Sequence, residues 1–331
     1  MGKRFLQDTE ENIEKLKRLY LEDGMSGVEI ANILGCSLPV VQRFLHRNAI
    51  YKKRIYNFSS EELLYIRKSL KEGKTRKQIA ETLHIPAYIV NRTANILEQK
   101  GKYSNILSNQ NWIEEKTALF WYFLGIFGSD GHLGRFNEID IFQKDGKYLK
   151  DLQEKIGHSG KLYGRDKTCY VLRITNALLH KILEEYGYAE DKRYDAPFVN
   201  VDNAEYQALY IRGLFDGDGS LYYKYVSGAF CGITWEIVTG SLTVAEGIKG
   251  TLKREKVDCA IETCTSNAGN LFYRVVVRNQ KEIVKLFNFL YSTNTELSMK
   301  RKYNNFKKLV NIISINNQVD DIVELPMKMG K

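Results

Sequence analysis

The sequence contains no run of about 18 apolar residues, and no apolar segment follows its first basic residues. The first absence excludes a single transmembrane helix, and the second excludes a secretory signal peptide. Leu6 also departs from the pattern of an N-myristoylated chain. We therefore expect a cytoplasmic protein that has no membrane partner.

Cysteines are few and scattered, and none lies in a Cys-x-x-Cys pair. Their odd number argues against a disulfide framework, and their spacing argues against a structural zinc site. No arrangement of serine, histidine and aspartate suggests a hydrolase triad. What remains is an ordinary globular composition, 44% hydrophobic and 27% charged, in a chain of 331 residues that can form two or three domains.

The net charge of +9 is distributed unevenly along the chain. Residues 1–112 carry 19 of the 49 Lys and Arg residues and 12 of the 40 Asp and Glu residues, whereas the remainder is nearly balanced. A basic surplus favours polyanionic partners. Many basic proteins bind no nucleic acid, so the charge alone does not identify the partner.

Residues 11–50 show the spacing of a helix-turn-helix module, with a helix at 28–34, a tight turn at Gly35 and a third helix at 38–46. The pattern repeats 49 residues later, where Val90 takes the place of Val41. We predict tandem helix-turn-helix modules over residues 1–105; the alternative is a helical bundle that binds a protein. The predicted DNA-binding side chains here are Gln42, Arg43, Arg47 and Arg92.

A polar linker at 106–111 precedes two copies of an apolar motif that ends in Asp-Gly. The first copy is FLGIFGSDG at 123–131, and the second is IRGLFDGDG at 211–219. A glycine inside a helix costs about 0.5–1 kcal/mol relative to alanine, so matched glycines indicate two backbones that approach closely. If the helices pack in parallel, Asp130 and Asp218 lie side by side. Two carboxylates at one point in a basic protein predict a metal site that acts on phosphodiesters.

One such helix alone would be read as a core helix with a glycine C-cap. The second copy changes this interpretation, because the same order of strands and helices follows each motif. We predict an α+β fold with two α-β-β-α-β-β-α repeats, at 112–200 and 201–331. Helices should cover one face of each sheet, and the other faces should form a concave saddle for a DNA groove. The basic strand residues predicted on that surface are Arg173, Arg274 and Arg278.

The last stretch, Asn316–Lys331, has no clear period and is expected to be a short strand or a frayed tail.

Two Asp-Gly helices in two such repeats resemble the single-chain LAGLIDADG homing endonucleases over residues 112–310. The resemblance implies a monomeric, site-specific endonuclease for double-stranded DNA that uses Mg²⁺ or Mn²⁺. By the same resemblance, Asp130 and Asp218 match the family's metal-binding acids. Gln143 matches a polar residue that orders the catalytic water. Thr239 stands at the corresponding place in the second repeat, which predicts unequal halves.

The position before the first acid, 129, is treated as equivalent to the glycine that precedes the acid in the second motif. It is assigned no metal-binding role, so the expected metal ligands are Asp130 and Asp218 alone.

The resemblance also implies a basic residue late in each repeat, for which the candidates are Lys192 and Lys300. Lys144 and Lys147, which follow Gln143, are further DNA-binding candidates. Two other functions stay open: a non-cleaving transcription regulator, and a maturase that binds intron RNA. Regulators of this kind usually carry the helix-turn-helix after the repeats and have often lost the acids, whereas here it comes first and both acids remain.

Overall fold

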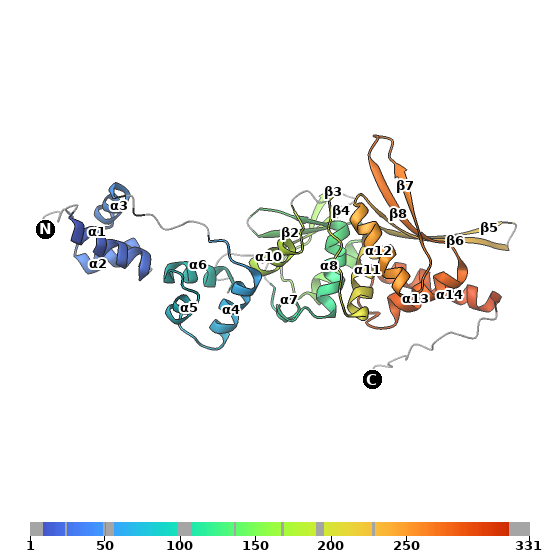
Figure 1. Cartoon of the computed structure of the whole chain (residues 1–331), viewed down its shortest axis with the longest axis horizontal. Coiled ribbons are helices and arrows are strands. Elements are labelled where there is room, and N and C mark those ends of the chain that lie inside the picture. The colour runs from blue at the N-terminus through green and yellow to red at the C-terminus, as the bar shows by residue number, and fades with distance from the viewer. Residues whose placement is uncertain are drawn as a thin grey trace. The chain divides into compact units, whose positions relative to one another are not determined.

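The structure is a computed structural model that describes residues 9–23, 25–48, 50, 56–97, 107–135, 137–166, 169–189, 195–226 and 229–317. The chain divides into two compact units, residues 1–103 (unit 1) and 104–331 (unit 2). Unit 1 is helical in its described part, and unit 2 contains two four-stranded sheets (Figure 1). Across these ranges, no single helix is long and apolar enough to cross a membrane; the bent pair of Gly27–Leu34 and Leu38–Arg47 passes only when counted together.

Unit 1 begins with a three-helix module whose turns are specified by its sequence. Ser26 and Glu29 form a capping box at the start of the second helix, and Gly35 ends that helix with φ of 60°. The second and third helices meet at 109°, within the range of helix-turn-helix pairs. The helices of unit 1 are α1 Glu10–Lys17, the π-helix η1 Arg18–Glu22, α2 Gly27–Leu34, α3 Leu38–Arg47, α4 Ser60–Lys71, α5 Arg76–Thr82 and α6 Ala87–Leu97.

The helices α4 to α6 repeat this local chemistry. Thr75 and Gln78 form the capping box of α5, and His84 has φ of 53° at the place that Gly35 takes in the first module. Ala80 and Val90 are buried, as are their counterparts 49 residues earlier. The same core positions are therefore filled twice, as the sequence pattern predicted.

Unit 2 consists of two repeats with the same order of elements. The elements up to the end of the first repeat are α7 Asn111–Glu114, α8 Ala118–Asp130, β1 Gly131–Leu133, β2 Glu138–Gln143, α9 Gly146–Lys155, β3 Tyr163–Asp166, β4 Cys169–Thr175 and α10 Ala177–Glu185. Those of the second repeat are α11 Ala204–Asp218, β5 Gly219–Val226, β6 Ala229–Thr239, α12 Leu242–Arg254, β7 Ala260–Thr265, β8 Leu271–Val277, α13 Gln280–Tyr291 and α14 Lys300–Asn317. The predicted α+β fold is confirmed.

The two sheets share topology and register. Their strand orders are β1-β2-β4-β3 and β5-β6-β8-β7, and all neighbours are antiparallel. Gln143 pairs with Tyr170 in the first sheet, and Thr239 pairs with Tyr273 in the second. Gln143 and Thr239 therefore occupy corresponding positions, as the sequence alignment of the two halves predicted.

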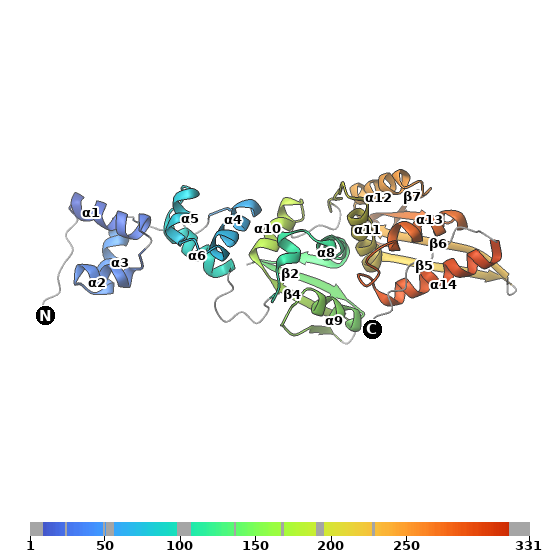
Figure 2. The ribbon, with the colours of Figure 1, turned by 90° about the horizontal axis from the view of Figure 1, so that it is seen from below.

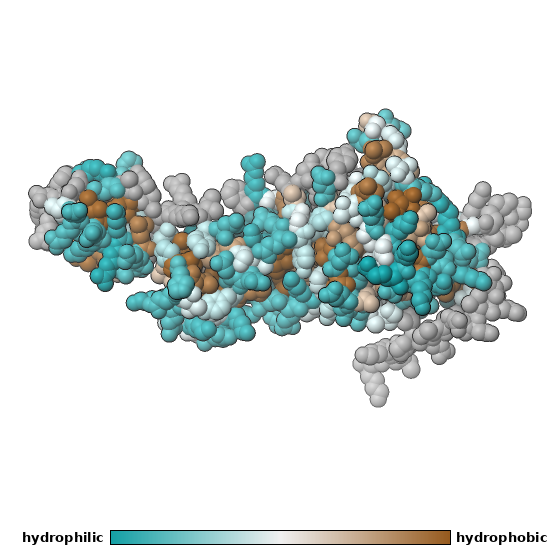
Figure 3. All heavy atoms as spheres, viewed as in Figure 1, coloured by the Kyte–Doolittle hydropathy of each residue, from teal (hydrophilic) through white to brown (hydrophobic). Residues whose placement is uncertain are grey.

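Helices cover one side of the second sheet, as Figure 2 shows for α13 and α14, which lie in front of β5 and β6. The surface of unit 2 seen in Figure 3 is mostly hydrophilic, and hydrophobic residues show in smaller patches. The sequence expectation for the end of the chain was wrong at its start, because α14 continues to Asn317. Residues 318–331 lie outside the described ranges.

Candidate functional site

The site is built on the close packing of α8 against α11. A Cβ atom added to Gly125 would lie 2.1 Å from the carbonyl oxygen of Tyr210 and 2.8 Å from the Cα atom of Gly213. A Cβ atom on Gly213 would lie 2.4 Å from the carbonyl oxygen of Tyr122. Gly125 meets Gly213, and further along the helices Ser129 meets Gly217. Both pairs differ by 88 in the sequence, so the helices are parallel and in register. The sequence prediction of a close parallel pair is confirmed.

Asp130 and Asp218 are the last residues of α8 and α11. The glycine after each aspartate has an extended conformation, with φ of −88° at Gly131 and −85° at Gly219. These glycines are therefore no left-handed caps. Glycine is needed because a Cβ atom would collide with the side chain of the phenylalanine four residues earlier, at 2.2 Å and 2.1 Å. The chain thus turns directly from each helix into the first strand of its sheet.

The two motifs were expected to be equivalent at the position before the acid. They differ there, because the first has Ser129 and the second has Gly217. Oγ of Ser129 donates to the carbonyl oxygens of Ile126 at 3.0 Å and Gly125 at 3.3 Å, within its own helix. A Cβ atom on Gly217 would lie 1.9 Å from this hydroxyl, so two side chains cannot be accommodated at this contact. The serine hydroxyl is engaged by α8, and the absence of Ser129 from the expected metal ligands stays a prediction.

Both aspartates line one pocket of about 900 Å³ between the two sheets. A Cβ atom on Gly217 would lie 2.8 Å from Oδ2 of Asp130, so the end of α11 packs closely against that carboxylate. The structure brings together four of the predicted residues here: Asp130, Asp218, Gln143 and Lys144. The other lining residues are Phe142, Asp145, Cys169, Asp216, Gly217, Gly219, Ser220, Leu221, Tyr222, Met299, Arg301, Lys302 and Asn305.

Gln143 makes a direct contact with one of the two carboxylates. Its Nε2 donates a hydrogen bond of 2.7 Å to Oδ2 of Asp130, and its Oε1 accepts from the backbone N–H of Lys144. At the corresponding place, Oγ1 of Thr239 accepts from the backbone N–H of Ser241 and so stabilises the turn before α12. Thr239 is not among the residues that line the pocket, so Gln143 has no counterpart there.

Lys302, which was not among the residues predicted from the sequence, is a half-buried basic residue of the pocket. Its Nζ donates to the carbonyl oxygens of Phe215 at 2.7 Å, Gly217 at 3.2 Å and Gly219 at 2.7 Å. Burial lowers the pKa of Lys302 to about 8, while the charges of Asp216, Asp130 and Asp218 act in the opposite direction. The ammonium group is thus held at the end of α11, between the carbonyl groups that flank Asp218.

Lys300, the predicted basic residue, does not line the pocket. It is exposed, and its Nζ donates to the carbonyl oxygen of Thr295. The physical reason is the phase of α14, which turns Lys302 inward together with buried Phe306 and Leu309 and leaves Lys300 outside. The other candidate, Lys192, lies outside the described residues.

The arginines predicted on the open faces of the sheets are held in ion pairs. Arg173 donates to both carboxylate oxygens of buried Asp140, at 2.8 and 2.7 Å, and this bond raises the pKa of Arg173. Arg274 pairs with Glu236 and Glu262, and its pKa is also raised. These groups neutralise carboxylates within the sheet, so a DNA contact through them stays a prediction.

Arg278 likewise pairs with Glu262, at 2.6 Å. Lys147 is exposed on α9 and lies outside the pocket lining, whereas Lys144 is exposed and lines it.

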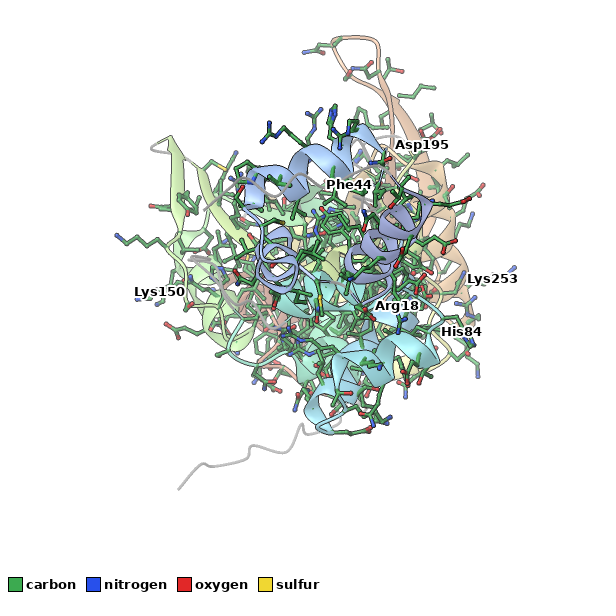
Figure 4. All side chains as sticks on the ribbon, turned by 90° about the vertical axis from the view of Figure 1, so that its left-hand side faces the viewer. Arg18, Phe44, His84, Lys150, Asp195 and Lys253 are labelled. Carbon is green, nitrogen blue, oxygen red and sulfur yellow. The ribbon has the colours of Figure 1, made fainter. Side chains whose placement is uncertain are left out.

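In unit 1, three of the four predicted DNA-binding residues gather on α3. Gln42, Arg43 and Arg47 line a shallow hollow together with Pro39 and His46. Figure 4 shows side chains that end in nitrogen projecting from the outer side of this helix, while Phe44 is buried on the opposite side. The fourth residue, Arg92, is exposed on α6.

The pocket offers oxygen ligands for a metal ion. No group of three or more His, Cys, Asp or Glu side chains suited to a metal occurs in the described part of the chain. Two carboxylates, Asp130 and Asp218, line the pocket together. Mg²⁺ is commonly bound by only one or two carboxylates, with water and substrate phosphate as its other ligands. The donor set therefore fits Mg²⁺, and it does not resemble a structural zinc site.

A family model and several solved structures are similar to this chain. The sequence model of the LAGLIDADG-like domain matches residues 205–290. The LAGLIDADG meganuclease I-AabMI bound to uncleaved DNA is similar at 12% identity and a TM-score of 0.43, over 60% of this chain and 91% of that one. The meganuclease I-SmaMI bound to uncleavable DNA has the same identity and coverage and a TM-score of 0.42. I-DmoI in complex with DNA and Ca has 16% identity and a TM-score of 0.39, over 58% of this chain and 97% of that one.

No curated protein matches the chain. The stretch matched by the family runs from the first turn of α11 into the last turn of α13 and contains Asp218 and the whole second sheet. The first repeat has the same order of elements and the same strand order in its sheet. Residues 205–290 are therefore similar to the LAGLIDADG-like domain, in agreement with the resemblance stated from the sequence.

Proposed function

We propose that this chain is a site-specific endonuclease that hydrolyses phosphodiester bonds on both strands of DNA with a divalent metal ion. The observation that carries the proposal is the parallel packing of α8 and α11, which brings Asp130 and Asp218 to one pocket. A structural helix pair would not need a carboxylate at the end of each helix, beside a half-buried lysine and a glutamine.

Each residue has a distinct task in this proposal. Asp130 and Asp218 would hold Mg²⁺, which when bound supplies Lewis acidity and lowers the pKa of a coordinated water. Gln143, fixed on Asp130, would orient the attacking water with an amide group. Lys302 would place positive charge where the phosphate becomes more negative. The carbonyl groups that bind Lys302 fix its position before the DNA arrives, so little reorganisation is needed.

The decisive experiment is a cleavage assay on DNA that carries the sequence flanking the gene's own point of insertion. Wild-type protein should linearise this DNA with Mg²⁺ or Mn²⁺ and should bind it uncut in EDTA. Binding without cleavage under all metal conditions would favour a regulator. Tight binding to intron RNA without DNA cleavage would favour a maturase.

We also propose that unit 1 binds DNA next to the cleavage site through α3 and α6. The hollow lined by Gln42, Arg43 and Arg47 supports this role, because these side chains can contact phosphates and base edges. Arg43→Ala combined with Arg92→Ala should weaken binding and flatten its salt dependence, by about 0.9 in the log–log slope for each lost phosphate contact.

The cleavage rate at saturating enzyme should not change in this double variant, because neither residue is part of the pocket. Lys150→Ala combined with Lys253→Ala, two exposed lysines of unit 2, controls for the lost charge. Equal affinity and equal salt slope for the arginine variant and wild type would instead indicate a protein-binding bundle.

A further inference from the structure

Asp216 is a buried carboxylate to which the proposed chemistry gives no task. It lies on α11, two residues before Asp218, and its exposed fraction is 0%. Burial raises its pKa, against the effect of the hydrogen bonds that it accepts. Among the described residues, its Oδ1 has no hydrogen-bond partner. Burying a carboxylate oxygen without a hydrogen-bond partner costs free energy, which a leucine of similar size would avoid. The presence of Asp216 here therefore needs an explanation.

The other carboxylate oxygen of Asp216 connects three elements. Oδ2 accepts a hydrogen bond of 2.8 Å from the hydroxyl of Tyr122 on α8, and one of 2.7 Å from the backbone N–H of Met299. Met299 immediately precedes α14, and its carbonyl oxygen accepts from the N–H of Tyr303 in the first turn. Asp216 therefore fixes the N-terminal end of α14, where a carboxylate also interacts favourably with the helix dipole.

The first turn of α14 carries Lys302, and the contacts return from there to α11. Nζ of Lys302 donates to the carbonyl oxygens of Phe215, Gly217 and Gly219, on either side of Asp216 and Asp218. The contacts form a closed circuit from the Asp216 carboxylate through the start of α14 and the lysine to the end of α11. Breaking it at Asp216 would free the helix end that sets the height and direction of the lysine.

A second buried residue of α11 holds the chain that leads into α14. The guanidinium of Arg212 donates to the carbonyl oxygens of Leu290, Thr293, Asn294 and Leu297, at the end of α13 and in its connection to α14. Arg212 lies one helical turn before Asp216, and its bonds end at residue 297. The connection is thus held in two places, and Asp216 holds the one next to the helix that carries Lys302.

We propose that Asp216 is a positioning residue that fixes the start of α14 and, through it, the ammonium group of Lys302 beside the two motif aspartates. The inference rests on the proposed function for its effect on cleavage, but the positioning itself is a property of the free protein. It also explains why an acid stands here in the second motif. The first motif has Gly128 at this position, where a Cβ atom would lie 2.9 Å from Leu214 and 3.1 Å from the hydroxyl of Tyr188.

The test is a double-mutant cycle on the full-length chain with single-turnover cleavage as its readout. Asp216→Ala should slow cleavage by about 10²-fold, as expected for a misplaced electrostatic group, and should leave DNA affinity unchanged. In the Lys302→Ala background, the same change should slow cleavage by less than about threefold, because the two residues act as one unit. Effects that multiply fully in the double variant would overturn the proposal.

Two further variants separate positioning from a general loss of stability. Asp216→Asn keeps an oxygen acceptor for Met299 and Tyr122 and should retain cleavage within about tenfold of wild type. Tyr148→Phe removes only the hydroxyl that bonds to Tyr122, at the far end of the network, and should leave the rate within about twofold. If Asp216→Asn were as slow as Asp216→Ala, the acceptor role of this residue would be wrong.

Amide hydrogen exchange in the absence of DNA tests the positioning without any cleavage. In Asp216→Ala, the amides of residues 299–303 should exchange faster, while those of α13 keep their protection. If this faster exchange were found although wild-type protein cut no DNA, the positioning would stand and the endonuclease would be rejected. Unchanged exchange at 299–303 in a chain whose wild type cuts DNA would reject the positioning alone.

Discussion

The two repeats of unit 2 share one frame and differ in what is attached to it. Both have a helix that ends in Asp-Gly, a sheet with the same strand order, and the same pairing register. The side chains at corresponding positions differ. Gln143 bonds to Asp130 in the first repeat, whereas Thr239 stabilises a turn in the second. A symmetric frame can therefore hold an asymmetric site.

The two repeats also differ at the sixth position of the motif, inside the helix pair. Asp216 in the second copy accepts from Tyr122 across the helix pair, while Gly128 in the first copy has little room for a side chain. Near Gly128, the hydroxyl of Tyr210, the counterpart of Tyr122, lies 3.3 Å from the hydroxyl of Tyr188. A tyrosine hydroxyl thus takes the place of a carboxylate. Tyr122 is thus satisfied by a carboxylate of the partner helix, and Tyr210 by a hydroxyl from the segment that follows α10.

The largest effect is expected from changing the motif aspartate that both repeats have in common. Asp130→Asn and Asp218→Asn should each reduce double-strand cleavage by about 10²-fold or more, because each loses a charged metal ligand. DNA affinity should hold, and thermal stability should stay unchanged or rise, because two close carboxylates are relieved. A plasmid cleavage assay, with a filter-binding measurement beside it, gives both quantities.

Asp151→Asn is the matched control, since Asp151 lies on α9 outside the pocket lining, is 45% exposed and pairs with its neighbour Lys155. This variant should cut at the normal rate. If Asp218→Asn also cut both strands at the normal rate, the shared role of the two acids would be lost.

The next experiment changes a position at which the two repeats differ. Gln143→Thr gives the first repeat the residue of the second and should slow one strand by about tenfold, the effect of losing a hydrogen bond to a charged group. We expect wild-type protein to accumulate nicked plasmid, and the variant to change the amount of this intermediate. Thr239→Ala, the control, should have little effect on either strand. Wild-type plasmid that passes directly from supercoiled to linear would show that the halves cut at equal rates.

A pH profile shows whether one lysine serves both strands. The pKa of Lys302 is lowered to about 8, so its charge is present below pH 8 and is lost as the pH rises through that value. The cleavage rate under kcat/KM conditions should therefore fall above pH 8, by up to about tenfold per pH unit. Lys302→Arg should move the fall to higher pH, because arginine keeps its charge. If the nicking rates of the two strands respond alike, the lysine serves both.

The smallest expected effect is a loss of stability when an ion pair is removed from either sheet. Arg173→Ala leaves the buried carboxylate of Asp140 without its bidentate partner and should reduce the free energy of unfolding by about 1–2 kcal/mol, less than for a fully buried pair because Arg173 is 40% exposed. Arg274→Ala should cost less, since Glu236 keeps the Tyr222 hydroxyl. Urea denaturation measures both values. No loss in either variant would show that these arginines are available for DNA.

Much of the frame could be predicted from local sequence, because its signals are local. Matched glycines predicted the helix contact, and the order of strands and helices after each motif predicted two sheets of the same topology. The carboxylates followed, since they end the helices that the glycines bring together. Gln143 was predicted from the family resemblance, and the strand register supports its correspondence to Thr239.

What the sequence left open depends on long-range contacts. Lys300, Arg301 and Lys302 form one basic run, and only the phase of α14 decides which of them turns toward the end of α11. That phase could have been read from the apolar spacing of Phe306, Leu309 and Ile313, which continues the series begun by Lys302. The bonds of Arg173 to Asp140 join residues 33 positions apart, and no local pattern reveals them.

The close packing of α8 also has a consequence for the synthesis of the protein on the ribosome. Every residue from Phe120 to Phe127 is buried in the finished fold, so this helix has no solvent-facing side there. Its partner α11 is synthesised 88 residues later, which at about 5–20 residues per second means roughly 4–18 seconds of waiting. During that time the apolar segment is exposed to solvent and can aggregate. We expect soluble yield to rise when a chaperone is supplied, and to fall when slower translation lengthens this interval.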